Sequence, residues 1–91
     1  MGKTYVNELG VKYICELEKS SAHIDGIGTV PVYGVRIFKE GCEYSSNEYD
    51  CSYVKDLSTR KSIAEEFVEL AIKHKLSPVH LSDAVYNFIC R

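Results

Sequence analysis

Ser-Pro-Val-His-Leu-Ser-Asp-Ala-Val-Tyr-Asn-Phe, residues 77–88, is the stretch that decides how the rest of the chain is arranged. Ser77 stands where a helix N-cap is expected, and Pro78 takes the first helical position, where its missing N–H costs nothing. Leu76 and Leu81 have the spacing of a hydrophobic staple across the start of the helix. Apolar residues then recur at intervals of three and four: Leu81, Ala84, Val85 and Phe88. The stretch predicts a short final helix whose apolar side lies on a core.

Two helices are predicted in the C-terminal third, over about residues 59–75 and 78–89. Ser58 or Thr59 is the expected N-cap of the first. Its apolar side is formed by residues at helical spacing: Ile63, Phe67, Leu70, Ala71 and His74. Because Ser77 precedes a proline, its backbone is pushed out of the α region, and the first helix must end before it.

The preceding part of the chain, about residues 4–55, has the patterns of β-strands. Apolar and polar residues alternate from Val11 to Leu17. Thr4–Glu8 is either a separate strand or an extension of this one, because Gly10 is either a turn or a bulge. The polar, glycine-containing segment Lys19–Thr29 is predicted to be a mobile connection, and Val30–Lys39 is predicted to be the next strand.

The turn after Lys39 can be placed in two ways. Lys39-Glu40-Gly41 can close a hairpin, or the strand can continue and turn near residues 45–47. The second choice places Cys42 opposite Cys51. In either case the alternation at Tyr49, Cys51 and Tyr53 predicts a further strand.

The order of these signals predicts the fold class. Strands come first and helices last, which is typical of an α+β fold. We expect an antiparallel sheet of three or four strands followed by two helices packed on one face. With 91 residues, the chain is expected to form a single domain over residues 1–91.

The C-terminal third resembles a known family. Ser-Pro-Val-His-Leu-Ser-Asp (residues 77–83), preceded by a helix that starts after Asp-Leu-Ser-Thr (residues 56–59), resembles a family of short proteins, mostly from spore-forming Gram-positive bacteria, known only as a domain of unknown function. The N-terminal half matches that family in general layout alone. His80 and Asp83 match the family pattern, but the resemblance implies no activity and no role for them.

Composition argues against several classes of partner. The net charge is −2, and lysines and arginines are scattered, so we expect no nucleic-acid binding. No apolar run approaches the roughly 20 residues of a membrane span, and the N-terminus lacks the apolar region of a signal peptide. A cytoplasmic protein that does not bind membranes is therefore expected.

The four cysteines, at positions 15, 42, 51 and 90, have no Cys-x-x-Cys spacing, so no metal site is predicted. In a cytoplasmic protein reduced thiols are the main expectation. If Cys42 and Cys51 do face each other across a hairpin, they are candidates for a redox-responsive pair. Gly26-Ile27-Gly28 is not read as a phosphate loop, because a strand follows it instead of a helix, and no cofactor is expected.

Catalysis is the lowest-ranked interpretation. His80 and Asp83 are three residues apart on the predicted final helix, where a carboxylate could orient an imidazole. One such pair does not define a reaction, and a structural role is the competing interpretation.

The tyrosines favour protein contacts. Tyr33, Tyr49 and Tyr53 lie on predicted strands, and tyrosine suits interfaces because it combines a large rigid ring with a polar tip. We expect a small non-enzymatic protein-interaction or regulatory module that binds a protein partner, including another copy of itself. The alternative is a small-ligand or redox-responsive protein that uses the Gly26 loop and the Cys42/Cys51 region. An enzyme built on His80 and Asp83 ranks third.

Overall fold

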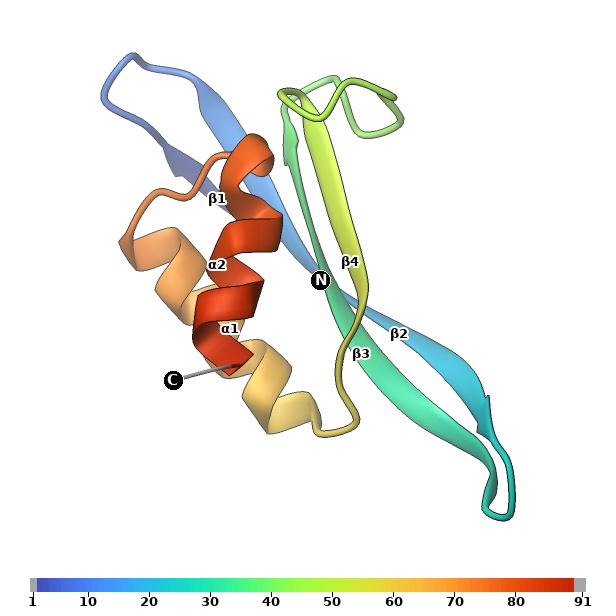
Figure 1. Ribbon diagram of the computed structural model, residues 1–91. Coiled ribbons are helices and arrows are strands. Elements are labelled where there is room, and N and C mark those ends of the chain that lie inside the picture. Colours follow the sequence, from blue (N-terminus) through green and yellow to red (C-terminus); the bar gives the residue numbers. More distant parts are fainter. Residues whose placement is uncertain (1, 90–91) are drawn as a thin grey trace.

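The computed structural model describes residues 2–89 of the chain (Figure 1). Four antiparallel strands follow one another in the sheet in the order β1-β2-β3-β4, and two helices come after them. The elements are β1 (Gly2–Val6), β2 (Lys12–Ile24), β3 (Gly28–Lys39), β4 (Cys51–Ser58), α1 (Lys61–Lys73), the 3₁₀ turn η1 (Pro78–His80) and α2 (Leu81–Ile89). The predicted α+β class, with strands first and two helices last, is confirmed.

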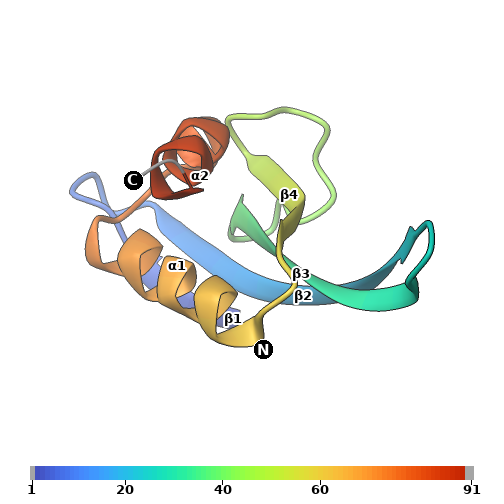
Figure 2. The same ribbon diagram turned by 60° about the horizontal axis from the view of Figure 1, so that its bottom comes forward.

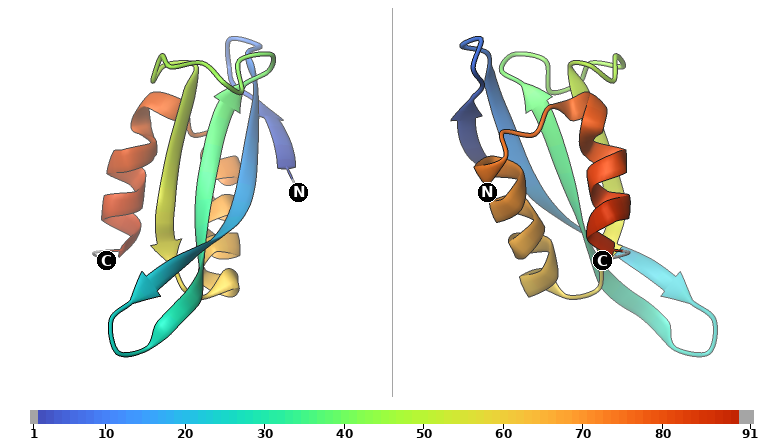
Figure 3. Two further views of the ribbon diagram at one scale, coloured as in Figure 1. Left: turned by 90° about the vertical axis from the view of Figure 1, so that its right-hand side faces the viewer. Right: turned by 60° about the vertical axis from the view of Figure 1, so that its left-hand side comes forward.

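Both helices lie on the same side of the sheet, as the two views of Figure 3 show. Odd-numbered residues of β2 and β3 point toward them, because side chains alternate between the two faces of a strand. One apolar cluster joins the sheet to the helices; its buried members are Tyr5, Tyr13, Cys15, Val35, Ile37, Leu57, Ala64, Phe67, Val68, Ala71, Leu81 and Val85. We call this part of the molecule the body.

A tight turn separates β1 from β2. The Asn7 side-chain oxygen accepts the backbone N–H groups of Leu9 and Val11, each at 2.9 Å, and Gly10 has φ of 81°. Asparagine and glycine are favoured in turns for these two reasons. Gly10 is therefore a turn and not a bulge, and the N-terminal segment is a strand of its own.

The prediction that Lys19–Thr29 is a mobile connection is wrong. β2 continues to Ile24 and β3 begins at Gly28, and the turn between them is closed by a hydrogen bond of 3.0 Å from the Ile27 N–H to the Ile24 carbonyl. The two strands extend beyond the helices as a long hairpin (Figures 1 and 2). We call residues 19–31 the hairpin arm. β3 continues directly from the turn, so a strand follows residues 26–28, as predicted.

The connection between β3 and β4 differs from both predicted turns. β3 ends at Lys39, β4 begins at Cys51, and residues 40–50 form a loop. Phe38 pairs with Cys51, so the register that placed Cys42 opposite Cys51 is wrong. Gly41, with φ of 85°, turns the chain away from the strand, and the Asn47 carbonyl accepts the N–H groups of residues 50 and 51 to start β4.

β4 passes unusually close to β3 at Gly34. The register shifts there, with Tyr33 paired to Ser58 but Val35 paired to Val54. A Cβ atom on Gly34 would lie 2.2 Å from the Val54 carbonyl oxygen and 2.4 Å from that of Lys55. The bulge therefore requires glycine at this position.

Helix α1 is shorter than the predicted 59–75. Its N-cap is Arg60, and the Ser58 hydroxyl accepts the Arg60 N–H at 3.0 Å instead of an N–H of the first helical turn. At the other end the Leu76 N–H donates to the Ala71 carbonyl and the Lys75 N–H to the Ile72 carbonyl. These two bonds form a Schellman motif, with Lys75 in the left-handed position (φ 51°) where glycine is usual.

The final helix, α2, runs to Ile89, the last described residue, but it starts differently from the prediction. Residues 78–80 form a 3₁₀ turn closed by the His80 N–H and the Ser77 carbonyl at 3.1 Å. The Ser77 hydroxyl makes no cap hydrogen bond, so that part of the prediction is wrong. Pro78 does take the first position and is buried, and Leu81 and Val85 carry the predicted apolar stripe into the core.

Candidate functional site

The hairpin arm exposes an unpaired strand edge. β1 pairs with β2 no further than Glu16, so among residues 2–89 no strand lies beside β2 from Lys19 to Ile24 on that side. Burial changes at the same place, since no residue of the arm is buried. An edge of this kind presents free backbone N–H and C=O groups to a partner chain.

The alternation of hydrogen-bonded and non-bonded pairs between β2 and β3 shows which backbone groups of β2 point outward. The Glu40 N–H donates to the Lys12 carbonyl at 3.0 Å, and directly opposite residues of an antiparallel pair alternate between bonded and non-bonded positions. Even-numbered residues of β2 therefore bond to β3. The N–H and C=O groups of Lys19, Ser21 and His23 consequently point away from β3, toward the free edge.

The opposite edge of the arm is blocked. Lys39 donates its N–H to the Asp50 carbonyl at 2.7 Å, which fixes the odd-numbered residues of β3 as those that point away from β2. Pro31 is one of these residues, and it has no N–H to donate. Because its backbone points away from β2, Pro31 removes no hydrogen bond between β2 and β3. It does leave the outer edge of β3 with one donor fewer for a partner strand. The β2 edge is the better template of the two.

A cavity of about 480 Å³ lies beside the base of the β2 edge, between the sheet and α1. It is lined by Lys3, Leu17, Lys19, Tyr33, Lys61, Glu65, Val68 and Glu69. The strand residues among them are odd-numbered and come from the helix-facing side of the sheet. The cavity thus lies next to the first outward-pointing residue of the edge, Lys19.

The charges around this cavity are unevenly paired. Lys3 forms an ion pair with Glu69, and that hydrogen bond raises the pKa of the Lys3 ammonium. Lys19 and Lys61 form no ion pair within the described part of the chain. Two ammonium groups without ion-pair partners therefore share the cavity with one carboxylate outside an ion pair, that of Glu65.

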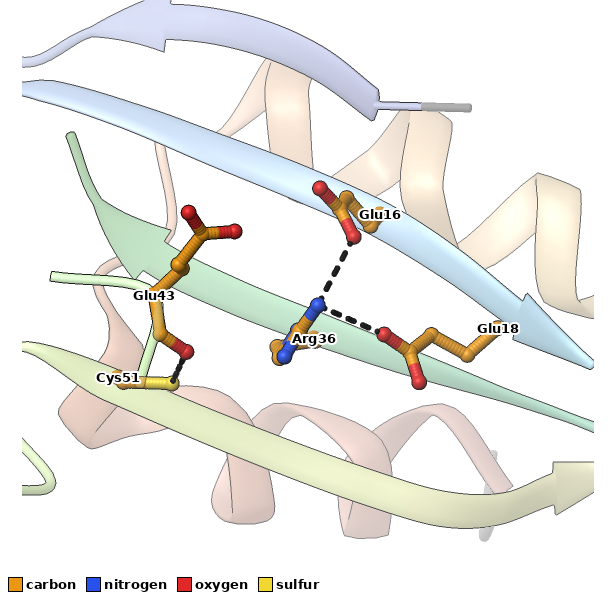
Figure 4. A network of polar contacts seen from close by, with 5 residues as sticks. All are labelled: Glu16, Glu18, Arg36, Glu43 and Cys51. Atoms are coloured by element: carbon orange, nitrogen blue, oxygen red, sulfur yellow. Dashed lines mark hydrogen bonds and ion pairs between the residues drawn. The ribbon is translucent and has the colours of Figure 1, made fainter. Parts of the chain in front are cut away.

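The face of the sheet away from the helices is occupied by a polar network (Figure 4). Arg36 contacts Glu16 at 3.2 Å and Glu18 at 3.0 Å, and its guanidinium lies over the ring of Phe38 and near that of Tyr44. Phe38 is 3% exposed even though it points away from the helices. These contacts pair the charge of Arg36 within the protein and cover part of this face of the sheet.

The three predicted tyrosines lie in three different places. Tyr33 faces the helices and lines the cavity, whereas Tyr53 is on the opposite face, beside Arg36. Partial burial, followed by the nearby charge of Glu18, raises the pKa of Tyr53. Tyr49, predicted on a strand, lies in the turn before β4 and is exposed. The three do not form one surface.

His80 and Asp83 are both exposed. His80 ends the 3₁₀ turn, Asp83 lies in the first turn of α2, and no ion pair joins them in the part of the chain that the structure describes. Neither residue lines the cavity beside the β2 edge.

Cys42 and Cys51 are free thiols. The Cys51 thiol donates to the Glu43 carbonyl at 3.4 Å (Figure 4), and burial raises its pKa, while the charge of Arg36 lowers it. A raised pKa reduces the thiolate fraction, and the thiolate is the reactive form. Cys90 lies outside the described residues.

The edge and the cavity were not predicted from the sequence, although one signal was present. Asp25-Gly26 between two extended segments is a typical hairpin turn, and Ala22 and Ile24 continue the alternation of β2. Lys19 and Lys61 are 42 positions apart, so only the packing of α1 on the sheet brings them to one cavity.

Metal and membrane features can be stated for residues 2–89. Within this range no three side chains of His, Cys, Asp or Glu are grouped as metal ligands would be. In the same range, neither helix has the length and apolar character that crossing a bilayer requires.

Comparison with known proteins supplies a family and no activity. No curated protein and no solved structure matches the chain. A family model described as a family of unknown function (DUF6514) matches residues 3–91. This match covers the strands as well as the helices, whereas the resemblance noted in the sequence was specific to the C-terminal third. The chain therefore belongs to this family of unknown function.

Proposed function

We propose that this protein is a small non-enzymatic interaction module that binds an extended segment of a protein partner by adding it as a strand to the edge of β2. The observation that carries the proposal is the outward direction of the N–H and C=O groups of Lys19, Ser21 and His23, on an edge beside which residues 2–89 place no strand. Strand addition uses such groups for affinity and the alternate side chains for specificity. The proposal keeps the expected cytoplasmic location and the expected origin in spore-forming Gram-positive bacteria.

The energetics favour a peptide-sized partner. Three outward residues can form up to about six backbone hydrogen bonds with an added strand, each contributing about 0.5–1.5 kcal/mol net. Added side chains that contact the protein beside the edge would increase this affinity. The arm itself contributes no buried residue to the core, so a partner can pair with it without disturbing the body.

A peptide selection tests the proposal. Random nine-residue peptides displayed on phage are selected on the wild-type protein and on the variants Ser21→Pro and Ser21→Ala. Proline removes the outward N–H of residue 21 and leaves the β2–β3 bonds in place, whereas alanine keeps the N–H and serves as the matched control. We expect peptides that bind the wild type and Ser21→Ala and bind Ser21→Pro at least tenfold more weakly.

Peptides that bind all three proteins equally, or no recovered peptides, would contradict strand addition at this edge. Circular dichroism of Ser21→Pro checks that the fold is retained. Light scattering shows whether a second copy of the 10.3 kDa chain can be the partner. A dimer that becomes a monomer in Ser21→Pro would identify self-association through the same edge.

A further inference from the structure

We infer that the segment added at the β2 edge carries an acidic side chain, which enters the cavity under α1 and binds between Lys19 and Lys61. This inference rests on the proposed function and specifies the chemistry of the partner. It combines three observations: the direction in which an added strand places its side chains, the size and walls of the cavity, and its charge.

The direction of the side chains on an added strand follows from how that strand pairs with β2. We take the pairing as antiparallel, which is slightly more stable per residue than parallel pairing. Residues directly opposite each other in an antiparallel pair point to the same face of the sheet. The Lys19 side chain lies on the helix-facing side, since Lys19 lines the cavity together with Leu17 and Tyr33. A partner residue opposite Lys19 therefore directs its side chain to the same side, toward α1.

The cavity has room for one such side chain. Its volume of about 480 Å³ is within the range of roughly 300–1,000 Å³ found for ligand sites, and it is partly open to solvent. Leu17, Val68 and the ring of Tyr33 provide apolar contacts for the methylene groups of an aspartate or glutamate. The carboxylate of that side chain is then free to contact the charged residues that line the cavity.

Charge decides the identity of the side chain. Lys3 is already paired with Glu69, which leaves the ammonium groups of Lys19 and Lys61 against the carboxylate of Glu65. An incoming carboxylate would give each ammonium group a carboxylate partner and form charge-assisted hydrogen bonds. An incoming lysine or arginine would add a third positive charge beside the ammonium groups of Lys19 and Lys61. A neutral side chain would leave both ammonium groups as they are.

The same peptide selection, read for composition, tests this inference. Among the peptides that depend on the edge, we expect aspartate or glutamate to be enriched at one fixed position. Replacing that residue by glutamine in a synthetic peptide should weaken binding about tenfold, measured by fluorescence anisotropy. The double variant Lys19→Glu/Lys61→Glu should weaken binding of the acidic peptide at least tenfold and favour peptides with lysine at that position.

A matched control distinguishes the cavity from general charge. Lys55→Glu reverses an exposed lysine on β4 that does not line the cavity, and it should leave affinity for the acidic peptide within twofold. Edge-dependent peptides without an acidic preference, or equal losses in Lys55→Glu and in the double variant, would overturn the inference and leave strand addition standing. Absence of edge-dependent peptides would overturn both.

Discussion

The body and the hairpin arm are built from the same two strands, β2 and β3, but different interactions hold them. In the body, Cys15, Val35 and Ile37 have no exposed surface and pack under the helices. In the arm the same strands continue with exposed residues, and Ile27 at the tip is 72% exposed. Pairing plus a core stabilises the first region, whereas pairing alone holds the second.

This difference explains where binding can occur. An isolated two-stranded hairpin is marginally stable, so the arm depends on its attachment to the body. The body in turn gains no buried side chain from the arm. A region that contributes little to folding is free to present backbone groups to a partner, and regions of low local stability are those from which binding elements are drawn.

The largest loss of stability is expected for a substitution of Gly34, in the body. Gly34→Ala places a Cβ atom 2.2 Å from the Val54 carbonyl oxygen, so the backbone of β4 must move. We expect a loss of about 4 kcal/mol or more in the free energy of unfolding, measured by urea denaturation. In the control Gly2→Ala the new methyl group meets side-chain atoms of Ile14 and Glu16 at 3.1 Å and no backbone atom, and about 1 kcal/mol or less should be lost. Similar losses in both variants would contradict the close approach at the bulge.

Leu81→Ala should cost about 3 kcal/mol of unfolding free energy. Leu81 has no exposed surface and belongs to the cluster that joins α2 to the sheet, so truncation removes apolar contacts and leaves a cavity. Thermal denaturation followed by circular dichroism measures the change. An unchanged curve would show that α2 is not docked on the body.

Cys15 gives the body a dependence on alkaline pH. Burial raises the pKa of its thiol from 9.0 to about 12, so over this interval the unfolded state loses the proton while the folded state keeps it. The unfolded state then binds fewer protons, and stability should fall as pH rises, by about 1.4 kcal/mol per pH unit. Cys15→Ala should remove that part of the slope in urea denaturations at several pH values. Cys42→Ala, which removes a loop thiol, is the control, and equal slopes in all three proteins would refute the assignment.

The smallest effect is expected in the arm. Ile27→Ser removes an exposed apolar side chain at the tip, and surface changes of this kind alter stability by about 0.5 kcal/mol or less. The midpoint of urea denaturation should stay close to that of the wild type. A loss comparable to that of Leu81→Ala would mean that the tip packs on the body.

The elements that could be predicted from the sequence are those in which apolar residues recur on one buried face. The stripe from Leu81 to Phe88 and the alternation from Val11 to Leu17 correspond to α2 and β2, because each pattern reflects one buried face. The arm was missed because most of its residues are exposed and none is buried, so no buried face marks it in the sequence. Such a strand is defined by backbone pairing, which leaves a weak mark on composition.

The candidate site could be predicted least. His80, Asp83, Cys42 and Cys51 were chosen for their chemistry. Cys42 does lie near Cys51, whose pKa it helps to raise, but the thiols are free and the predicted register between them is wrong. The edge consists of backbone groups, whose direction depends on the β2–β3 register. The cavity depends on the docking of α1 over β2, a contact between distant parts of the chain that no local pattern encodes.

Amide hydrogen exchange of β2, followed residue by residue by nuclear magnetic resonance, shows directly whether the β2 edge is free to pair. The N–H groups of Ser20 and Ala22 point to β3 and should be protected, whereas those of Lys19, Ser21 and His23 should exchange at least tenfold faster. Addition of a peptide selected for edge-dependent binding should then protect these three amides. Equal protection of all five in the protein alone would contradict a free β2 edge, as would a bound peptide that leaves the three unprotected.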